Sequence, residues 1–207
     1  MKFTKKILAG FFLLMTFGVL IGTSSCAKSN TPQMVKLEAP ERPAGQENVL
    51  QLRCDPIPTV RVAFIGLGSR GLEAVRRFMY LEGIEVIAIC DINKDFVLKT
   101  QELLTENNRP RALEFTGEED WKKVCELENV DLIYNCTHWT LHTPVAVYAM
   151  EQGKHIALEV PAAMSIEDCW KLVDTAEKTR RHCMMLENCC YDFFEMATLN
   201  MAQQGLL

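Results

Sequence analysis

A glycine-rich turn follows residues 60–65, the first of the short apolar runs in residues 59–190. It has the pattern G-x-G-x-x-G, and its glycines are Gly66, Gly68 and Gly71. Between a strand and a helix, such glycines allow a tight turn, the approach of a pyrophosphate to the backbone, and close packing of the helix on the strand. Ser69 and Arg70 stand inside the turn, where a hydroxyl and a guanidinium can reach phosphate oxygens. The pattern predicts a dinucleotide site, and a purely structural glycine turn is the alternative.

A carboxylate at the end of the second apolar run is placed to bind a ribose. Asp91 lies 20 residues after Gly71, and an acidic residue at this spacing accepts hydrogen bonds from the ribose hydroxyls of the adenosine. Its neighbours Ile92 and Asn93 supply no cation for a 2′-phosphate, so the sequence favours NAD over NADP. The alternative role for Asp91 is to cap the following helix.

A group of polar and aromatic residues follows the fourth apolar run. Trp139 and His142 lie in this segment, and we expect them to contact the ribose on the nicotinamide side, because ligands bind at the carboxyl edge of a parallel sheet. Packing of Trp139 in the core is the alternative. His138 and His142 are four residues apart, but Pro144 places them in a loop and no carboxylate follows at ligand spacing. We therefore expect no metal site.

Residues 59–190 alternate short apolar runs with amphipathic stretches. The runs predict strands at residues 60–65, 84–90, 112–115, 130–136, 155–159 and 183–186. The stretches predict helices at residues 71–80, 94–107 and 144–152, and one more that carries Trp170, Val173 and Ala176. Ser165 and Asp168 form a capping box for this last helix. The alternation predicts an α/β fold of the Rossmann type, a doubly wound parallel sheet with helices on both faces.

The first 26 residues have the composition of an export signal. Three lysines precede an uncharged apolar run at residues 7–21, which is shorter than a comfortable membrane span. Small residues and Cys26 follow, so we expect a lipoprotein signal at residues 1–26 with Cys26 lipidated; ordinary cleavage after Ala27 is the alternative. The mature protein is then exported and lipid-anchored in the cell envelope. Residues 27–58 hold five of the eight prolines and predict a flexible linker.

Charge and cysteine usage narrow the class of protein. The 207 residues carry 22 Lys and Arg against 27 Asp and Glu, a formal charge of −5. Without residues 1–26, which hold three lysines and no acidic residue, 19 basic residues face 27 acidic ones, so we expect no nucleic-acid partner. The nine cysteines include no C-x-x-C pair. We expect most of them to be buried as small apolar residues, and one or two disulfide bridges stay open.

Several separated motifs resemble the Gfo/Idh/MocA superfamily of NAD(P)-dependent proteins. They are a His after the fourth strand, Gly153-Lys154-His155, and Glu159-Val160-Pro161, where the superfamily has Glu-Lys-Pro. The continuation from Met184 to Tyr191 is similar to one branch, glycoside hydrolase family 109. The resemblance implies that NAD is contacted by Ser69, Arg70, Asp91, Trp139, Thr140, Leu141, His142, Glu159, Val160 and Asn188. It places Tyr191 on the substrate side, and packing at a helix start is the alternative for that residue.

The resemblance implies a glycosidase, because Val160 replaces the lysine with which the superfamily's dehydrogenases transfer a proton. Family 109 hydrolyses terminal α-linked N-acetylgalactosamine. NAD takes a hydride from carbon 3, loss of the proton on carbon 2 expels the aglycone, water adds, and the hydride returns. The alternatives are an NAD-dependent sugar oxidoreductase of the same superfamily and a non-catalytic, NAD-binding lipoprotein remnant.

The resemblance also implies a second domain. Family members carry a C-terminal substrate domain that supplies the catalytic His and a Tyr, so we expect the catalytic residues beyond Leu207. Residues 191–207 would be the start of that α+β domain, with a helix from Tyr191 to Gly205, and the chain would be an N-terminal fragment. Its substrates would be glycans that end in α-linked N-acetylgalactosamine.

Overall fold

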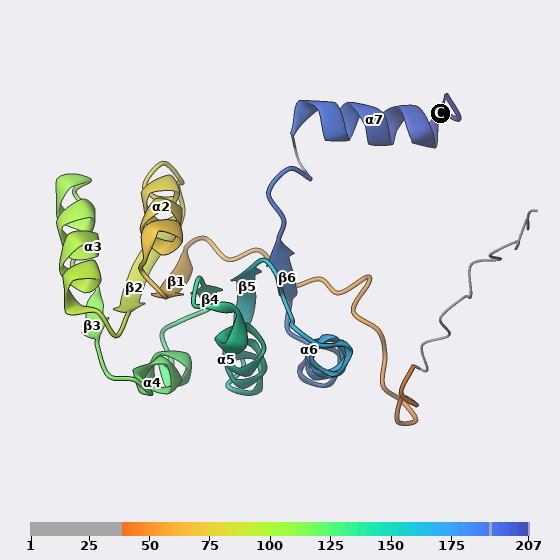
Figure 1. Cartoon of the computed structure of the whole chain (residues 1–207), viewed down its shortest axis with the longest axis horizontal. Helices are drawn as coiled ribbons and strands as arrows, with labels where there is room; N and C mark the ends of the chain where they lie inside the picture. Colours follow the sequence, from red (N-terminus) through yellow and green to blue (C-terminus); the bar gives the residue numbers. More distant parts are fainter. Residues whose placement is uncertain (1–38, 191, 207) are drawn as a thin grey trace, which may run out of the picture. The chain divides into compact units, whose positions relative to one another are not determined.

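One six-stranded sheet organises the computed structural model, which describes residues 39–190 and 192–206. The strand order is β3-β2-β1-β4-β5-β6, and every neighbouring pair is parallel (Figure 1). The strands are β1 (Val60–Ile65), β2 (Ile84–Cys90), β3 (Leu113–Phe115), β4 (Leu132–Asn135), β5 (His155–Glu159) and β6 (Cys183–Leu186). This is the order of a doubly wound Rossmann sheet, so the predicted fold class is confirmed. The expected signal segment, Cys26 and Tyr191 lie outside the described residues.

Helices cover both faces of this sheet (Figure 1). On one face lie α2 (Ser69–Phe78) and α3 (Lys94–Glu106). The other face carries α4 (Asp120–Glu126), α5 (Trp139–Glu151) and α6 (Ile166–Thr179). A further helix, α7 (Phe193–Gln203), follows β6 and has no buried residue.

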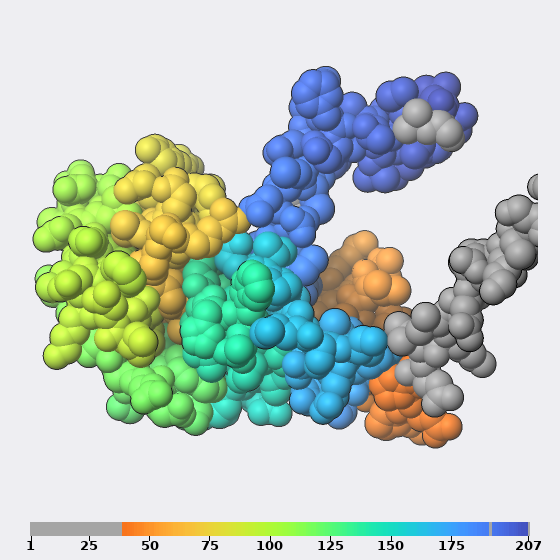
Figure 2. Space-filling view, in the orientation of Figure 1, coloured from red at the N-terminus to blue at the C-terminus, as the bar shows by residue number. Residues whose placement is uncertain are grey.

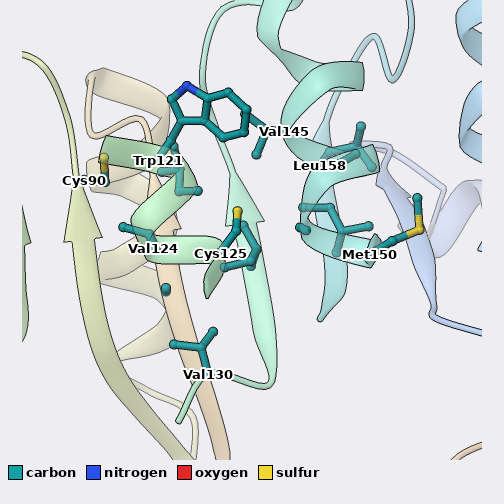
Figure 3. Packing of buried hydrophobic residues seen from close by; sticks show 14 of the residues in the cluster. Cys90, Trp121, Val124, Cys125, Val130, Val145, Met150 and Leu158 are labelled. Carbon is teal, nitrogen blue, oxygen red and sulfur yellow. The ribbon is translucent and has the colours of Figure 1, made fainter. Parts of the chain in front are cut away.

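Each face of the sheet has its own hydrophobic core. Successive side chains of a strand point to opposite faces, so Val62 and Phe64 of β1 join the core under α2 and α3. Ala63 and Ile65 join the core under α4, α5 and α6. Figure 3 shows part of this second core, where Trp121 of α4 packs near the sheet. Because strands such as β1 are buried on both faces, their sequences are apolar runs without alternation.

The structure also corrects two helix predictions. Helix α5 begins at Trp139, whereas the sequence predicted its start at Pro144. Pro144 is instead inside the helix, where its missing N–H leaves the Thr140 carbonyl without a backbone donor. The segment around Trp139 is therefore the first turn of a helix and not a loop. Helix α4 was not predicted, because its seven residues are too few to show a helical period.

Part of the predicted linker is docked on the domain. The described residues 39–58 contain no helix or strand before β1, as expected, but residues 42–48 contact α6. Glu177 is 3% exposed, and its carboxylate accepts hydrogen bonds from Arg42 Nε at 2.9 Å and Gln46 Nε2 at 2.7 Å. Arg180 donates to the carbonyls of residues 47 and 48. We call residues 42–48 the arm, and Figure 2 shows it, in orange, against α6, in blue. The arm is thus anchored, which the prediction of a flexible linker missed.

The cysteines are less buried than the sequence predicted. The eight cysteines among the described residues are all free. Cys90 and Cys125 are buried, and burial raises the pKa of each thiol to about 12. Four others are exposed, so the expectation that most would be buried is wrong for the described residues; they are Cys54, Cys169, Cys189 and Cys190. Within the same residues, no helix combines the length and the apolar character needed to cross a membrane.

Replacing Glu177 should release the arm. In Glu177→Ala, Arg42 and Gln46 lose their shared acceptor, so we expect endoproteinase Glu-C to cleave after Glu47 several times faster than in the unmodified chain. The control is Glu167→Ala, which removes an exposed carboxylate of the same helix that pairs only with Lys171. Limited proteolysis followed by mass spectrometry measures both rates. Equal rates in the two variants would show that Glu177 does not hold the arm.

Candidate functional site

The glycine-rich turn joins β1 to α2 and leaves open space at its centre. Gly66 has a φ of +87°, and a Cβ there would lie 2.5 Å from the carbonyl carbon of Cys136. A Cβ on Gly71 would overlap the carbonyl oxygen of Gly66, whereas a Cβ on Gly68 would have no atom within 4 Å. The fold itself therefore requires glycine at the first and third positions. The second glycine borders a space that a ligand can enter.

The first turn of α2 faces that space with backbone donors. Gly68 is the N-cap of α2, and no side chain caps this end of the helix. Ser69 is exposed at the first helical position. N–H groups at an uncapped helix start carry partial positive charge and favour an anion. The turn thus fits the pyrophosphate of a dinucleotide, as the sequence predicted.

Asp91 is tied to the glycine-rich turn. Its Oδ2 accepts a hydrogen bond from the Leu67 N–H at 2.6 Å, and its Oδ1 accepts one from the Asn93 N–H at 2.8 Å. The cap of α3 is Asn93, whose side chain accepts from Asp95, so Asp91 is not the helix cap. Each carboxylate oxygen can accept a second hydrogen bond. Asp91 can therefore bind ribose hydroxyls while it holds the turn, and its charge opposes a 2′-phosphate.

Three predicted contact residues from distant parts of the sequence meet beside the turn. Arg70 Nε lies 3.0 Å from Oε1 of Glu159 at the end of β5, and its Nη2 donates to Oδ1 of Asn188 after β6. The hydrogen bond to Glu159 raises the pKa of the Arg70 guanidinium above its ordinary value. The Glu159 side chain is 7% exposed, and a buried carboxylate requires such a partner. In this structure Arg70 is thus turned to Glu159 and Asn188, whereas the sequence indicated that it can reach phosphate oxygens.

The first turn of α5 divides into a buried and an exposed part. His142 is 1% exposed; its Nδ1 lies 2.7 Å from the Pro161 carbonyl and its Nε2 lies 2.9 Å from the Thr137 carbonyl. Trp139 is 59% exposed, so it does not pack in the core. The Thr140 hydroxyl is 2.7 Å from Nδ1 of His138. His142 therefore links two loops at the carboxyl edge, and Trp139 is free to contact a ligand.

The remaining predicted residues lie near the same edge or outside the described residues. Val160 is half-buried between Glu159 and Pro161, and the peptide bond between Val160 and Pro161 is cis. Leu141 is half-buried in α5 and packs against the core. Tyr191 is not among the described residues. The described part of the chain holds no group of three or more His, Cys, Asp or Glu side chains suited to a metal ion.

Two residues of β4 belong to this site and were missed from the sequence. The Tyr134 hydroxyl lies 3.3 Å from Oε1 of Glu159. Asn135 is fully buried, and its Oδ1 accepts hydrogen bonds from the N–H and the hydroxyl of Thr137. Both residues stood inside an apolar run that predicted only a strand. The available signal was that a buried hydroxyl or amide must find a hydrogen-bonding partner.

Replacing Gly68 or Gly71 by alanine should distinguish what the fold requires from what NAD binding requires. In Gly68→Ala the added methyl group meets no protein atom, so we expect the free energy of unfolding to change by less than about 1 kcal/mol. The methyl group occupies the space for the pyrophosphate, so we expect the Kd for NAD to rise at least about tenfold. Gly71→Ala should lose about 1–3 kcal/mol of stability from the overlap with Gly66. Calorimetric titration and thermal denaturation measure the two effects. Unchanged NAD affinity in Gly68→Ala would contradict the placement of the pyrophosphate.

Comparison with known proteins finds relatives that are more than half identical to this chain over most of its length. The chain is 59% identical over 160 residues to glycosyl hydrolase family 109 protein 2 of Phocaeicola vulgatus, a match that covers 77% of this chain and 39% of that protein. It is 56% identical over 161 residues to a protein of Bacteroides fragilis named alpha-N-acetylgalactosaminidase, covering 78% and 38%. The chain thus spans about two fifths of the length of these relatives.

The fold is also similar to solved structures. A WlbA dehydrogenase from Bordetella pertussis, in complex with NADH and UDP-GlcNAcA, superposes with a TM-score of 0.60 at 19% identity, over 71% of this chain and 42% of that one. This likeness concerns the fold alone. Residues 60–187 match the Gfo/Idh/MocA family, described as an oxidoreductase family with an NAD-binding Rossmann fold. With its glycine-rich turn and its strand order, the chain belongs to the Gfo/Idh/MocA family and contains that family's NAD-binding Rossmann domain.

Proposed function

We propose that the whole protein is an NAD-dependent α-N-acetylgalactosaminidase of glycoside hydrolase family 109, and that this chain provides its cofactor-binding part. The observation that carries the proposal is the 56% identity to the Bacteroides fragilis protein of that name. The substrates would be glycans that end in α-linked N-acetylgalactosamine. The match extends over 78% of this chain.

The residue at position 160 supports a glycosidase over a sugar dehydrogenase. A dehydrogenase of this superfamily is expected to place a lysine there, beside the end of β5. Val160 is half-buried next to Glu159 and has no titratable group, so it can transfer no proton to or from a substrate hydroxyl. Any proton transfer at the sugar must come from residues other than Val160.

Each part of the site has a defined task in this function. NAD, when bound, would supply reversible acceptance of a hydride. The turn at Gly68 and the start of α2 bind the pyrophosphate, and Asp91 binds the adenosine ribose. Arg70 holds the buried carboxylate of Glu159 in place on the nicotinamide side. Because these groups bind and orient without moving a proton, the acid and base are assigned to residues outside the described part.

The activity is tested with the full product of the gene and a chromogenic α-N-acetylgalactosaminide. We expect release of the aglycone while absorbance at the NADH wavelength stays below about one equivalent per protein, because the hydride returns to the sugar in each turnover. Reading the coding DNA beyond the codon for Leu207 defines which product to assay. Accumulation of NADH with free sugar would instead identify an oxidoreductase, and NAD binding without either reaction would identify a non-catalytic protein.

We also propose that the protein is exported and anchored by a lipid on Cys26. The support is the sequence alone, a basic start, an uncharged apolar run and small residues before this cysteine. A tightly held cofactor suits this location, since a cofactor that is regenerated in each turnover needs no external pool.

The anchor is tested by Cys26→Ala. We expect the unmodified chain to sediment with membranes and to incorporate labelled fatty acid, and the variant to lose the label, because the acylated sulfur is gone. The control is Cys54→Ala, which changes an exposed cysteine of the segment before β1. Equal labelling of the Cys26→Ala variant and the control would refute lipidation at Cys26.

A further inference from the structure

The carboxylate of Glu159 is held by only one of its oxygens. Arg70 Nε and the Tyr134 hydroxyl both contact Oε1, at 3.0 Å and 3.3 Å. Among the described residues, Oε2 has no hydrogen-bonding partner. Oε2 is therefore the oxygen that can accept a further hydrogen bond. The two oxygens of one buried carboxylate thus have different surroundings.

Tyr134 is rigidly placed for this contact. It is 6% exposed, and its ring lies 5.2 Å from that of Phe64 and 5.4 Å from that of Phe78, centroid to centroid. These rings come from β1 and α2, so the hydroxyl is fixed by the central strand and by the helix that follows the glycine-rich turn. Burial raises the pKa of Tyr134 to about 12. At neutral pH the hydroxyl therefore keeps its proton and donates a hydrogen bond to Oε1.

The position of Glu159 in the sheet defines which half of a dinucleotide it faces. Asp91 follows β2, on one side of the switch point between β1 and β4, and in this fold an acidic residue there marks the adenosine half. Glu159 ends β5, on the other side of the switch point. The carboxylate thus lies on the nicotinamide side of the site.

We propose that Tyr134 is a positioning residue: together with Arg70 it holds Oε1 of Glu159, so that Oε2 faces the nicotinamide half of the bound dinucleotide. Without the hydroxyl, the carboxylate keeps one partner and can rotate about its last bond, which spreads its acceptor over several directions. The inference rests on the NAD-binding site and not on the glycosidase activity. A loss of glycosidase activity would therefore leave it unaffected.

The test is Tyr134→Phe in the full chain, with binding of NAD and of ADP measured by calorimetric titration. The ring stays in its aromatic cluster, and the variant removes only the hydroxyl, which contacts Glu159 and the Arg77 side chain. We expect the Kd for NAD to rise about tenfold and the Kd for ADP to change less than about twofold, because ADP has no nicotinamide half. A purely structural role would weaken both ligands alike, and unchanged NAD affinity would also overturn the proposal.

Two further variants test whether Tyr134 acts on NAD binding through Glu159. In a Glu159→Ala background, Tyr134→Phe should weaken NAD less than about twofold further, because the group that it positions is absent. The matched control is Tyr148→Phe, which removes another tyrosine hydroxyl bonded to a carboxylate, that of Glu126, outside the site. We expect this control to bind NAD as the unmodified chain does. Additive losses in the double variant would show that Tyr134 does not act through Glu159.

Discussion

The central position of β1 is the constraint on which the site depends. This strand pairs with β2 on one side and β4 on the other, and its last four residues are buried on both faces. From β1 the chain proceeds outward to β2 and β3, then returns past β1 to β4, β5 and β6. The connections therefore diverge at the carboxyl end of β1, and an open region forms there. The glycine-rich turn lies at that point because it is the first segment after β1.

Close backbone packing at this point leaves no room for a side chain at Gly66 or Gly71. The turn lies against the backbone after β4 at Gly66, and α2 lies against the turn at Gly71. These contacts leave no volume for a side chain, so the helix start is held at a fixed distance from the sheet. Asp91 adds a second constraint, since it binds the Leu67 N–H from the end of the neighbouring strand. The backbone donors of the turn are thus oriented before a ligand arrives.

The charged cluster of Arg70 and Glu159 links the two halves of the sheet. Arg70 belongs to the helix after β1, and Glu159 ends β5. The pair lies in a partly buried place, where removal of one partner leaves the other charge without compensation. Tyr134 belongs to β4, the strand between β1 and β5, and contacts the same carboxylate oxygen as Arg70. The Glu159 carboxylate therefore contributes both to the stability of the fold and to the geometry of the nicotinamide side.

The sequence by itself determined the sheet, the glycine-rich turn and the acidic residue after β2. Apolar runs and glycine spacing are local patterns, so the bounds of β1, β2, β5 and β6 and the cap of α6 by Ser165 agree with the prediction. Only the tertiary structure decided which side chains meet. Arg70 binds Glu159, Tyr134 joins them, and the arm docks on Glu177, because each pairing joins residues far apart in the chain. Such pairings depend on the order of strands and on which face each helix covers, and no local pattern records either.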